Sequence, residues 1–278
     1  MKLNQFYVDD VIKNALCEDI NYIDTSADLV FDENDTTTAY FVAKASGILC
    51  GIDVALRVFE LLDSSFEVTK HFEDGAKVNK GDVIADFKGK TAYLLKGERT
   101  ALNLLQHMSG IATQTNEAVE KIKGTNASVA DTRKTLPGLR ALQKYAVTVG
   151  GGKNHRYNLS DGVMLKDNHI DACGSIANAV AKVRKNLGHM VKIEVETRNL
   201  DEVKQAVETG VEVIMLDNMT NEQMREAVNY VNGRALLEAS GNITGETISD
   251  VAKTGVDIIS IGALTHSVKA FDISMKIK

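Results

Sequence analysis

Residues 191–218 read "VKIEVETRNLDEVKQAVETGVEVIMLDN": two short apolar runs on either side of a segment whose apolar residues have helical spacing. The alternation continues with "ALLEASGN" at residues 235–242, followed by "TGETISDVAKTG", and with "DIISIGA" at residues 257–263. Short, nearly continuous apolar runs are typical of strands buried on both faces, and strands that alternate with helices pair in parallel. This region therefore predicts a β/α barrel, closed or incomplete.

Each of these predicted strands ends on a polar or small residue: Glu196, Asp217, Ser240 followed by Gly241, and Gly262. Their spacings are 21, 23 and 22 residues, so they occupy the same position in successive units. In a β/α barrel the carboxyl ends of the strands converge on one mouth, where barrel enzymes have their active sites. Polar or small residues at four strand ends in phase therefore predict an active site at this mouth.

The first part of the chain has a different pattern. Residues 37–91 contain short alternating runs such as "TTAYFVAKASGILCG" and "FEVTKHF", punctuated by glycines as in the hairpins of a compact sheet. We expect an N-terminal α+β, sandwich-like domain over residues 1–110, with residues 266–278 packing against it. The barrel domain with the active site is expected over residues 111–265.

Composition limits the classes of function. The chain has 278 residues, of which 44% are hydrophobic and 25% charged, and a net charge of -6, so it has no overall attraction for nucleic acid or anionic membranes. Its three cysteines form no CxxC pair, which argues against a disulfide framework or a zinc site. No apolar run approaches the roughly 18 residues of a membrane span, and the first residues do not resemble a secretory signal. We expect a soluble, cytoplasmic protein.

Positive charge is concentrated in one part of this acidic chain. "VADTRKTLPG" at residues 129–138 and "GGGKNHRYNLSDGVMLKDNH" at residues 150–169 lie within a region that holds seven Lys or Arg and three Asp between Asp131 and His169. The rest of the chain has 25 basic and 35 acidic residues. Taken singly, each of these cations is more often a surface charge, but together they predict a small anionic ligand.

Two kinds of chemistry are expected at the barrel mouth. The glycines in "ASGNITGET" and "SIGALTHS" let a ligand approach the backbone, and the helices expected after them favour anions at their N-termini, which predicts a phosphate site. The carboxylates of Glu196 and Asp217 have three interpretations: a general acid/base pair, partners for nearby lysines, or ligands of Mg²⁺. A phosphate site beside them makes the magnesium interpretation coherent.

Six segments carry a resemblance to a known family: "ERTALNLLQHMSGIAT", "DTRKTLPGLR", "KYAVTVGGGKNHRYNLSDGVMLKDNHI", "IMLDN", "EASGNI" and "ISIGALTHS". In this order they closely resemble quinolinate phosphoribosyltransferase, also called nicotinate-nucleotide pyrophosphorylase (carboxylating). The resemblance runs from about residue 74 to the C-terminus, and the first 70 residues fit the family's N-terminal domain more loosely. Six ordered motifs are a specific signal, whereas any one of them alone would be weak.

The resemblance implies an enzyme of de novo NAD biosynthesis, a pentosyltransferase. That family uses Mg²⁺ to transfer phosphoribosyl from phosphoribosyl pyrophosphate to quinolinate, and releases pyrophosphate and CO₂ to give nicotinic acid mononucleotide. It also implies a homodimer or higher homo-oligomer, in which Arg99 reaches the barrel mouth of a neighbouring subunit. Neither nucleic acid nor a membrane is an expected partner.

The resemblance also implies roles for individual residues. The quinolinate carboxylates would be held by Arg133, His155, Arg156 and Lys166. Lys134 and Lys166 would lie near the pyrophosphate, and Thr132 would contact substrate beside them. Glu196 and Asp217 would hold Mg²⁺ and the ribose hydroxyls. The 5′-phosphate would be bound by Ser240, Gly241, Asn242, Gly262 and Ala263. Lys134, Lys166, Glu196 and Asp217 are the expected catalytic residues.

Other functions remain open at this stage. Nicotinate phosphoribosyltransferase and a molybdenum-transport-associated relative are the nearest alternatives, but the density of Arg133, Arg156 and Lys166 favours a ligand with two carboxylates. A Schiff-base aldolase that uses Lys166 is an alternative from another enzyme class, and borohydride trapping would reveal it. A phosphate-binding protein without catalysis would leave Glu196 and Asp217 unexplained.

Overall fold

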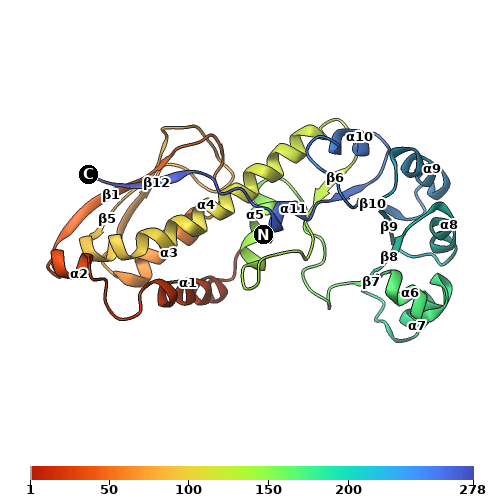
Figure 1. Ribbon diagram of the computed structural model, residues 1–278, viewed down its shortest axis with the longest axis horizontal. Helices are drawn as coiled ribbons and strands as arrows, with labels where there is room; N and C mark the ends of the chain where they lie inside the picture. Colours follow the sequence, from red (N-terminus) through yellow and green to blue (C-terminus); the bar gives the residue numbers. More distant parts are fainter. Residues whose placement is uncertain (1) are drawn as a thin grey trace. The chain divides into compact units, whose positions relative to one another are not determined.

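The computed structural model describes residues 2–278 and divides into two compact units, each assembled from separate segments of the chain (Figure 1). The N-terminal unit comprises Met1–Asn116, Thr135–Gly151 and Leu264–Lys278, and the barrel unit comprises Glu117–Lys134 and Gly152–Ala263. These units do not follow a cut of the chain at residues 110 and 265. Residue 110 lies inside one continuous helix, α4 (Thr91–Lys121), and residues 135–151 belong to the N-terminal unit.

The barrel unit is built on a six-stranded sheet in the order β6-β11-β10-β9-β8-β7, with parallel pairing throughout. Its strands are β6 (Ser128–Ala130), β7 (Val163–Leu165), β8 (Ile193–Thr197), β9 (Val213–Asp217), β10 (Leu236–Ser240) and β11 (Ile258–Ser260). Within residues 2–278, no ladder pairs β7 with β6, and Ala130 of β6 forms a single parallel bridge to Lys153. The predicted β/α fold is confirmed, in its incomplete form.

Helices connect the parallel strands because a parallel pair needs a crossover. They are α6 (Asp167–Cys173), α7 (Ile176–Asn186), α8 (Leu200–Glu208), α9 (Asn221–Val231) and α10 (Ile248–Ala252). Ser175, Asn199 and Thr220 each accept a hydrogen bond from a first-turn amide of the helix that follows, which fixes where α7, α8 and α9 begin. Figure 1 shows these helices along one side of the strands, where their apolar faces are buried.

The N-terminal unit contains a four-stranded antiparallel sheet in the order β12-β1-β5-β3. Its strands are β1 (Thr36–Ala43), β3 (Glu67–Lys70), β5 (Val83–Lys90) and β12 (Ile273–Ile277), and β2 (Gly47–Ile48) pairs with β4 (Lys77–Val78) in a separate small sheet. The C-terminal strand β12 pairs with β1, so the end of the chain completes the sheet of the N-terminal unit.

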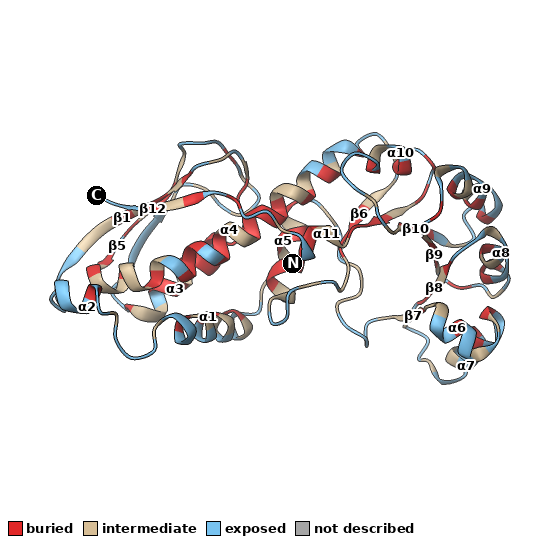
Figure 2. Ribbon diagram, in the orientation of Figure 1, coloured by how far each residue is buried: buried red, intermediate tan, exposed pale blue. Residues whose placement is uncertain are grey.

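The helices that belong wholly or largely to the N-terminal unit are α1 (Gln5–Asp19), α2 (Ala27–Val30), α3 (Ile52–Leu62), α4, α5 (Arg140–Val149) and α11 (Ala263–His266). Phe41 of β1, Phe59 of α3 and Phe87 of β5 are buried together, with ring centroids 4.9 to 6.1 Å apart. Figure 2 shows α3 and α4 as buried over much of their length. None of the helices in the described part of the chain is both long and apolar enough to cross a membrane.

Candidate active site

A pocket of about 330 Å³ opens at the carboxyl ends of the strands in the barrel unit. Nine of the predicted site residues line it: Thr132, Arg133, Lys134, His155, Arg156, Lys166, Glu196, Asp217 and Ser240. Met164, Met215, Glu238 and Ser260 complete the lining. The structure therefore brings together the cations of the early strands and the carboxylates of the later ones.

The other predicted residues lie outside this lining. Gly241 and Asn242 follow Ser240 directly, Gly262 follows the carboxyl end of β11, and Ala263 begins α11, so all four lie at the pocket's edge of the sheet. Arg99 lies on α4 in the N-terminal unit with an exposed side chain. Its predicted contact with a neighbouring subunit stays a prediction.

Strand register explains why the two predicted magnesium ligands share the pocket. In the parallel ladders Glu196 is level with Met215, and Ser240 is level with Asp217. Side chains two residues apart on a strand point to the same face, so Asp217 lies one step beyond Met215 on the face that Glu196 occupies. Both carboxylates line the pocket and both residues are half-buried.

The two arginines of the pocket are held near each other. Arg156 donates a hydrogen bond to the carbonyl oxygen of Gly162 at 3.1 Å, and its other terminal nitrogen lies 3.6 Å from the sulfur of Met164. Burial and the nearby charge of Arg133 lower the pKa of the Arg156 guanidinium. Nε of Arg133 is buried and has no hydrogen-bond partner within residues 2–278. Two repelling guanidinium groups, one with an unsatisfied donor, form a site that favours a carboxylate ligand.

Lys166 and Glu196 form an ion pair inside the pocket, between Nζ and Oε2. The carboxylate is the more buried partner, since the side chain of Glu196 is 12% exposed and that of Lys166 is 45% exposed. Oδ2 of Asp217 accepts a hydrogen bond from the side chain of Asn218 at 2.9 Å. Two carboxylates on adjacent strands are a donor set that suits Mg²⁺, which takes one or two carboxylates and completes its shell with substrate oxygens and water. The residues present therefore fit the expected ion.

The loop after β10 is fixed by Asn218 in the loop after β9. The backbone N–H of Asn218 donates to the carbonyl oxygen of Ser240 at 2.9 Å, and the side chain of Asn242 donates to Oδ1 of Asn218 at 3.1 Å. Gly241 between them has a φ of +94°, and a Cβ there would lie 2.2 Å from Oδ1 of Asn218. Glycine is therefore needed at 241 both for backbone conformation and for space.

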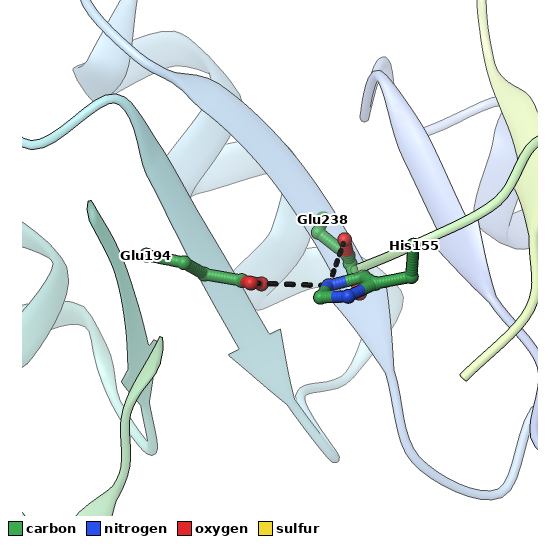
Figure 3. A group of neighbouring side chains, drawn as sticks. All are labelled: His155, Glu194 and Glu238. Carbon is green, nitrogen blue, oxygen red and sulfur yellow. Dashed lines mark ion pairs between the residues drawn. The ribbon is translucent and has the colours of Figure 1, made fainter. Parts of the chain in front are cut away.

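The pocket also contains a cluster that the sequence analysis missed. Figure 3 shows the ring of His155 between Glu194 of β8 and Glu238 of β10. Nε2 of His155 lies 3.0 Å from Oε2 of Glu194 and 3.4 Å from Oε2 of Glu238. The side chains of Glu194 and Glu238 are only 8% and 2% exposed. A simple signal would have found both, because Glu194 is two residues before Glu196, and Glu238 two before Ser240, on the same faces of their strands.

The protonation of this cluster is set by its contacts. Nδ1 of His155 accepts the backbone N–H of Arg156 at 2.8 Å, which places a proton on Nε2, facing the two carboxylates. Burial and the amide contact, which needs an unprotonated Nδ1, favour the neutral ring, whereas the two carboxylates favour a charged ring and raise the pKa of His155. Burial raises the pKa of Glu194, despite its hydrogen bond with His155.

These contacts also bear on what His155 can bind. The ligand atoms of His155, Glu194 and Glu238 lie within 4.8 Å of one another, close enough for a cation. A metal on Nε2 would displace the proton that the Arg156 amide favours there, so the ring as placed does not fit a metal ligand. The expected contact between His155 and a substrate carboxylate stays a prediction, since both ring nitrogens already contact protein groups.

Comparisons with known proteins agree with this fold. Residues 23–109 match the family described as quinolinate phosphoribosyl transferase, N-terminal domain, and residues 111–276 match its C-terminal domain. A probable nicotinate-nucleotide pyrophosphorylase [carboxylating] from Bacillus subtilis is 44% identical over 99% of this chain and 95% of its own length. A chloroplastic nicotinate-nucleotide pyrophosphorylase [carboxylating] from Arabidopsis thaliana is 44% identical over 96% of this chain and 82% of its own. The crystal structure of NadC from Streptococcus pyogenes superposes with a TM-score of 0.96 at 44% identity, covering 99% of this chain and 98% of that one.

An open β/α barrel with a cation-rich pocket at its strand ends, attached to an antiparallel N-terminal unit, thus defines an enzyme of the phosphoribosyltransferase class. The chain belongs to the quinolinate phosphoribosyltransferase family. The resemblance carried by the six sequence motifs is confirmed, and membership of this family decides against the aldolase and the non-catalytic alternatives.

The contact between Gly241 and Asn218 leads to a test of the loop. We expect Gly241→Ala to destabilise the protein more than Gly233→Ala, a matched control that also has a positive φ, of +75°. Both substitutions strain the backbone, but among the described residues nothing lies within 4 Å of a Cβ at 233. The collision at 241 should add about 1–3 kcal/mol to the loss of unfolding free energy in urea denaturation. Equal losses for the two variants would show that Asn218 moves aside without cost.

Proposed function

We propose that this enzyme transfers phosphoribosyl from phosphoribosyl pyrophosphate to quinolinate with loss of CO₂, giving nicotinic acid mononucleotide and pyrophosphate in de novo NAD biosynthesis. The observation that carries the proposal is the pair Arg133 and Arg156, held near each other in a part-buried pocket beside the carboxylates Glu196 and Asp217. Quinolinate has two carboxylates, and phosphoribosyl pyrophosphate has a phosphate and a pyrophosphate. The names of the relatives, which include quinolinate phosphoribosyltransferase [decarboxylating] in Nicotiana tabacum, support this choice.

The chain's own residues mainly bind, orient and neutralise charge. Arg133 and Arg156 receive the quinolinate carboxylates, while Lys134 and Lys166 face the pyrophosphate, with Thr132 beside them. The loops at Ser240–Asn242 and Gly262–Ala263 bind the 5′-phosphate through backbone N–H groups. Holding both substrates in line lowers the barrier by replacing a bimolecular encounter with a positioned one.

The bond changes need no covalent intermediate on the protein. The bond between the sugar carbon and the pyrophosphate oxygen breaks, pyrophosphate takes the electron pair, and the pyridine nitrogen attacks the cationic sugar carbon. The ring nitrogen is then positive, so the bond to the adjacent carboxylate breaks, CO₂ leaves, and the ring carbon keeps the electron pair and takes up a proton. Lysine charges that face the departing pyrophosphate stabilise the first step.

Glu196 and Asp217 are the proposed magnesium ligands. When bound there, Mg²⁺ would neutralise negative charge on the pyrophosphate and the ribose oxygens. Lys166 pairs with Glu196 beside this proposed site, so its charge also lies near the substrate oxygens that the ion would contact.

Purified protein tests the reaction directly. We expect conversion of quinolinate and phosphoribosyl pyrophosphate to nicotinic acid mononucleotide and CO₂, with far slower turnover of nicotinate, which lacks the second carboxylate. Arg133→Ala and Arg156→Ala should each lower kcat/KM, because a substrate carboxylate loses its bidentate partner. The loss should correspond to about 2–5 kcal/mol of transition-state stabilisation. Arg225→Ala, at an exposed arginine of the same unit, is the control. Equal rates with quinolinate and nicotinate would overturn the assignment.

Magnesium dependence is the second expectation. Activity should disappear with EDTA and return with added Mg²⁺, and Glu196→Gln or Asp217→Asn should raise the Mg²⁺ concentration needed for half-maximal activity. Glu246→Gln, at an exposed glutamate of the barrel unit, should leave this requirement unchanged. Full activity without divalent ions would show that the two carboxylates have another role.

We also propose a homodimer or higher homo-oligomer in which Arg99 acts on a neighbouring subunit's site; like the cytoplasmic location, this assembly stays a prediction. Arg99→Ala and Arg133→Ala should each be nearly inactive. After subunit exchange about half of the dimers should be hybrids with one complete site in two, so about a quarter of wild-type activity should return. No recovery after verified exchange would mean that Arg99 serves its own chain or only packs.

A further inference from the structure

The cluster of His155 with Glu194 and Glu238 has more acceptors than donors. Nε2 of His155 is shared between one oxygen of each carboxylate, at 3.0 and 3.4 Å. The second oxygen of each, Oε1, is buried and has no hydrogen-bond partner in the described part of the chain. Two buried carboxylates that share one donor are unfavourable for stability, and apolar residues of similar size would cost less at these positions. Stability therefore does not explain the cluster.

What the cluster does is fix the orientation of one ring. Glu194 and Glu238 come from β8 and β10, the two neighbours of β9, and approach Nε2 from different strands (Figure 3). A proton held on Nε2 leaves Nδ1 as the acceptor for the backbone N–H of Arg156. The ring therefore ties the backbone at Arg156 to the inner face of the sheet.

The backbone around the ring is held from a second direction. The N–H of His155 donates to the buried carboxylate of Asp131 at 2.9 Å. The guanidinium of Arg156 donates to the carbonyl oxygen of Gly162 and lies against Met164 in the pocket. Arg156 is thus held at both ends, its backbone N–H by His155 and its guanidinium by Gly162 and Met164.

We propose that Glu194 and Glu238 are positioning residues for the pyridine dicarboxylate: they hold His155, and His155 holds Arg156 where it receives a substrate carboxylate. This inference rests on the proposed function of the pocket and adds two residues to it. It implies a selective effect. The loop proposed to bind phosphate begins at Ser240, only two residues after Glu238 on β10. A substitution that distorts β10 would therefore weaken the binding of both quinolinate and phosphoribosyl pyrophosphate. A substitution that only releases the ring of His155 should weaken the binding of quinolinate alone.

The test compares substitutions that keep or remove the acceptor. Glu238→Gln and Glu194→Gln retain an oxygen for Nε2, and we expect near wild-type kinetics. Glu238→Leu and Glu194→Leu each remove one of the two acceptors, so the ring is held from one strand instead of two. For each we expect the KM for quinolinate to rise roughly ten- to a hundredfold, with the KM for phosphoribosyl pyrophosphate within about twofold of wild type. The unfolding temperature of the leucine variants should not fall, because each loses an unfavourable buried carboxylate. Glu246→Gln is the surface control.

A spectroscopic measurement tests the cluster without any reliance on turnover. Nitrogen-15 NMR of the His155 side chain, in protein without substrate, should show Nε2 protonated and Nδ1 as an acceptor in the wild type and the glutamine variants, and an altered ring signal in the leucine variants. If the wild type fails to convert quinolinate while this pattern holds, the proposed reaction is wrong but the positioning of the ring stands.

Three results would overturn the inference. The first is a ring signal in both leucine variants that matches the wild type. The second is an equal rise in KM for both substrates together with a lower unfolding temperature, which would indicate a structural role. The third is glutamine variants as impaired as the leucine variants, since an acceptor of the same shape would then not suffice.

Discussion

Positive side chains held close together repel one another, and the pocket of the barrel unit depends on offsetting that repulsion. Its lining includes Arg133, Lys134, Arg156 and Lys166, and the pKa of Arg156 is lowered by burial and by Arg133. The inner face of the sheet supplies the opposite charge. Glu196 pairs with Lys166, and the buried carboxylates of Glu194 and Glu238 contact His155, which precedes Arg156. Substrate anions then add favourable contacts to a site that is already assembled, so less reorganisation is needed when they bind.

Parallel pairing is what makes this charge balance possible. Because all six strands run in the same direction, their carboxyl ends meet at one edge, and cations from the chain around β6 and β7 face carboxylates from β8, β9 and β10. An antiparallel sheet would distribute the same strand ends over two edges. The barrel does not need to close for this purpose, since the pocket is lined from strands across the whole open sheet.

The sequence predicted the parts of the site that depend on local pattern. Strand ends such as Glu196 and Asp217 follow from apolar runs of known length. Glu194 and Glu238 could also have been predicted, because alternation along a strand places them on the same faces as Glu196 and Ser240. An acidic residue inside an apolar run does not by itself indicate a functional site, however. The assignment of residues 135–151 to the N-terminal unit was not predictable, because the apolar face of α5 indicates that it is buried but not against which unit.

The pocket contains two hydrogen-bond networks that divide the work of positioning. Asn218 connects the carboxylate of Asp217 with the loop at Ser240 and Asn242, so the groups proposed to bind the ribose and its phosphate are fixed as one set. His155 connects two buried glutamates with the backbone of Arg156. The two networks share no residue, although β10 contributes to both. With the proposed assignment of substrates, a substitution in one network should therefore change the binding of one substrate and leave the other as it was, so that a single barrel mouth is tuned separately for a pyridine acid and for a sugar phosphate.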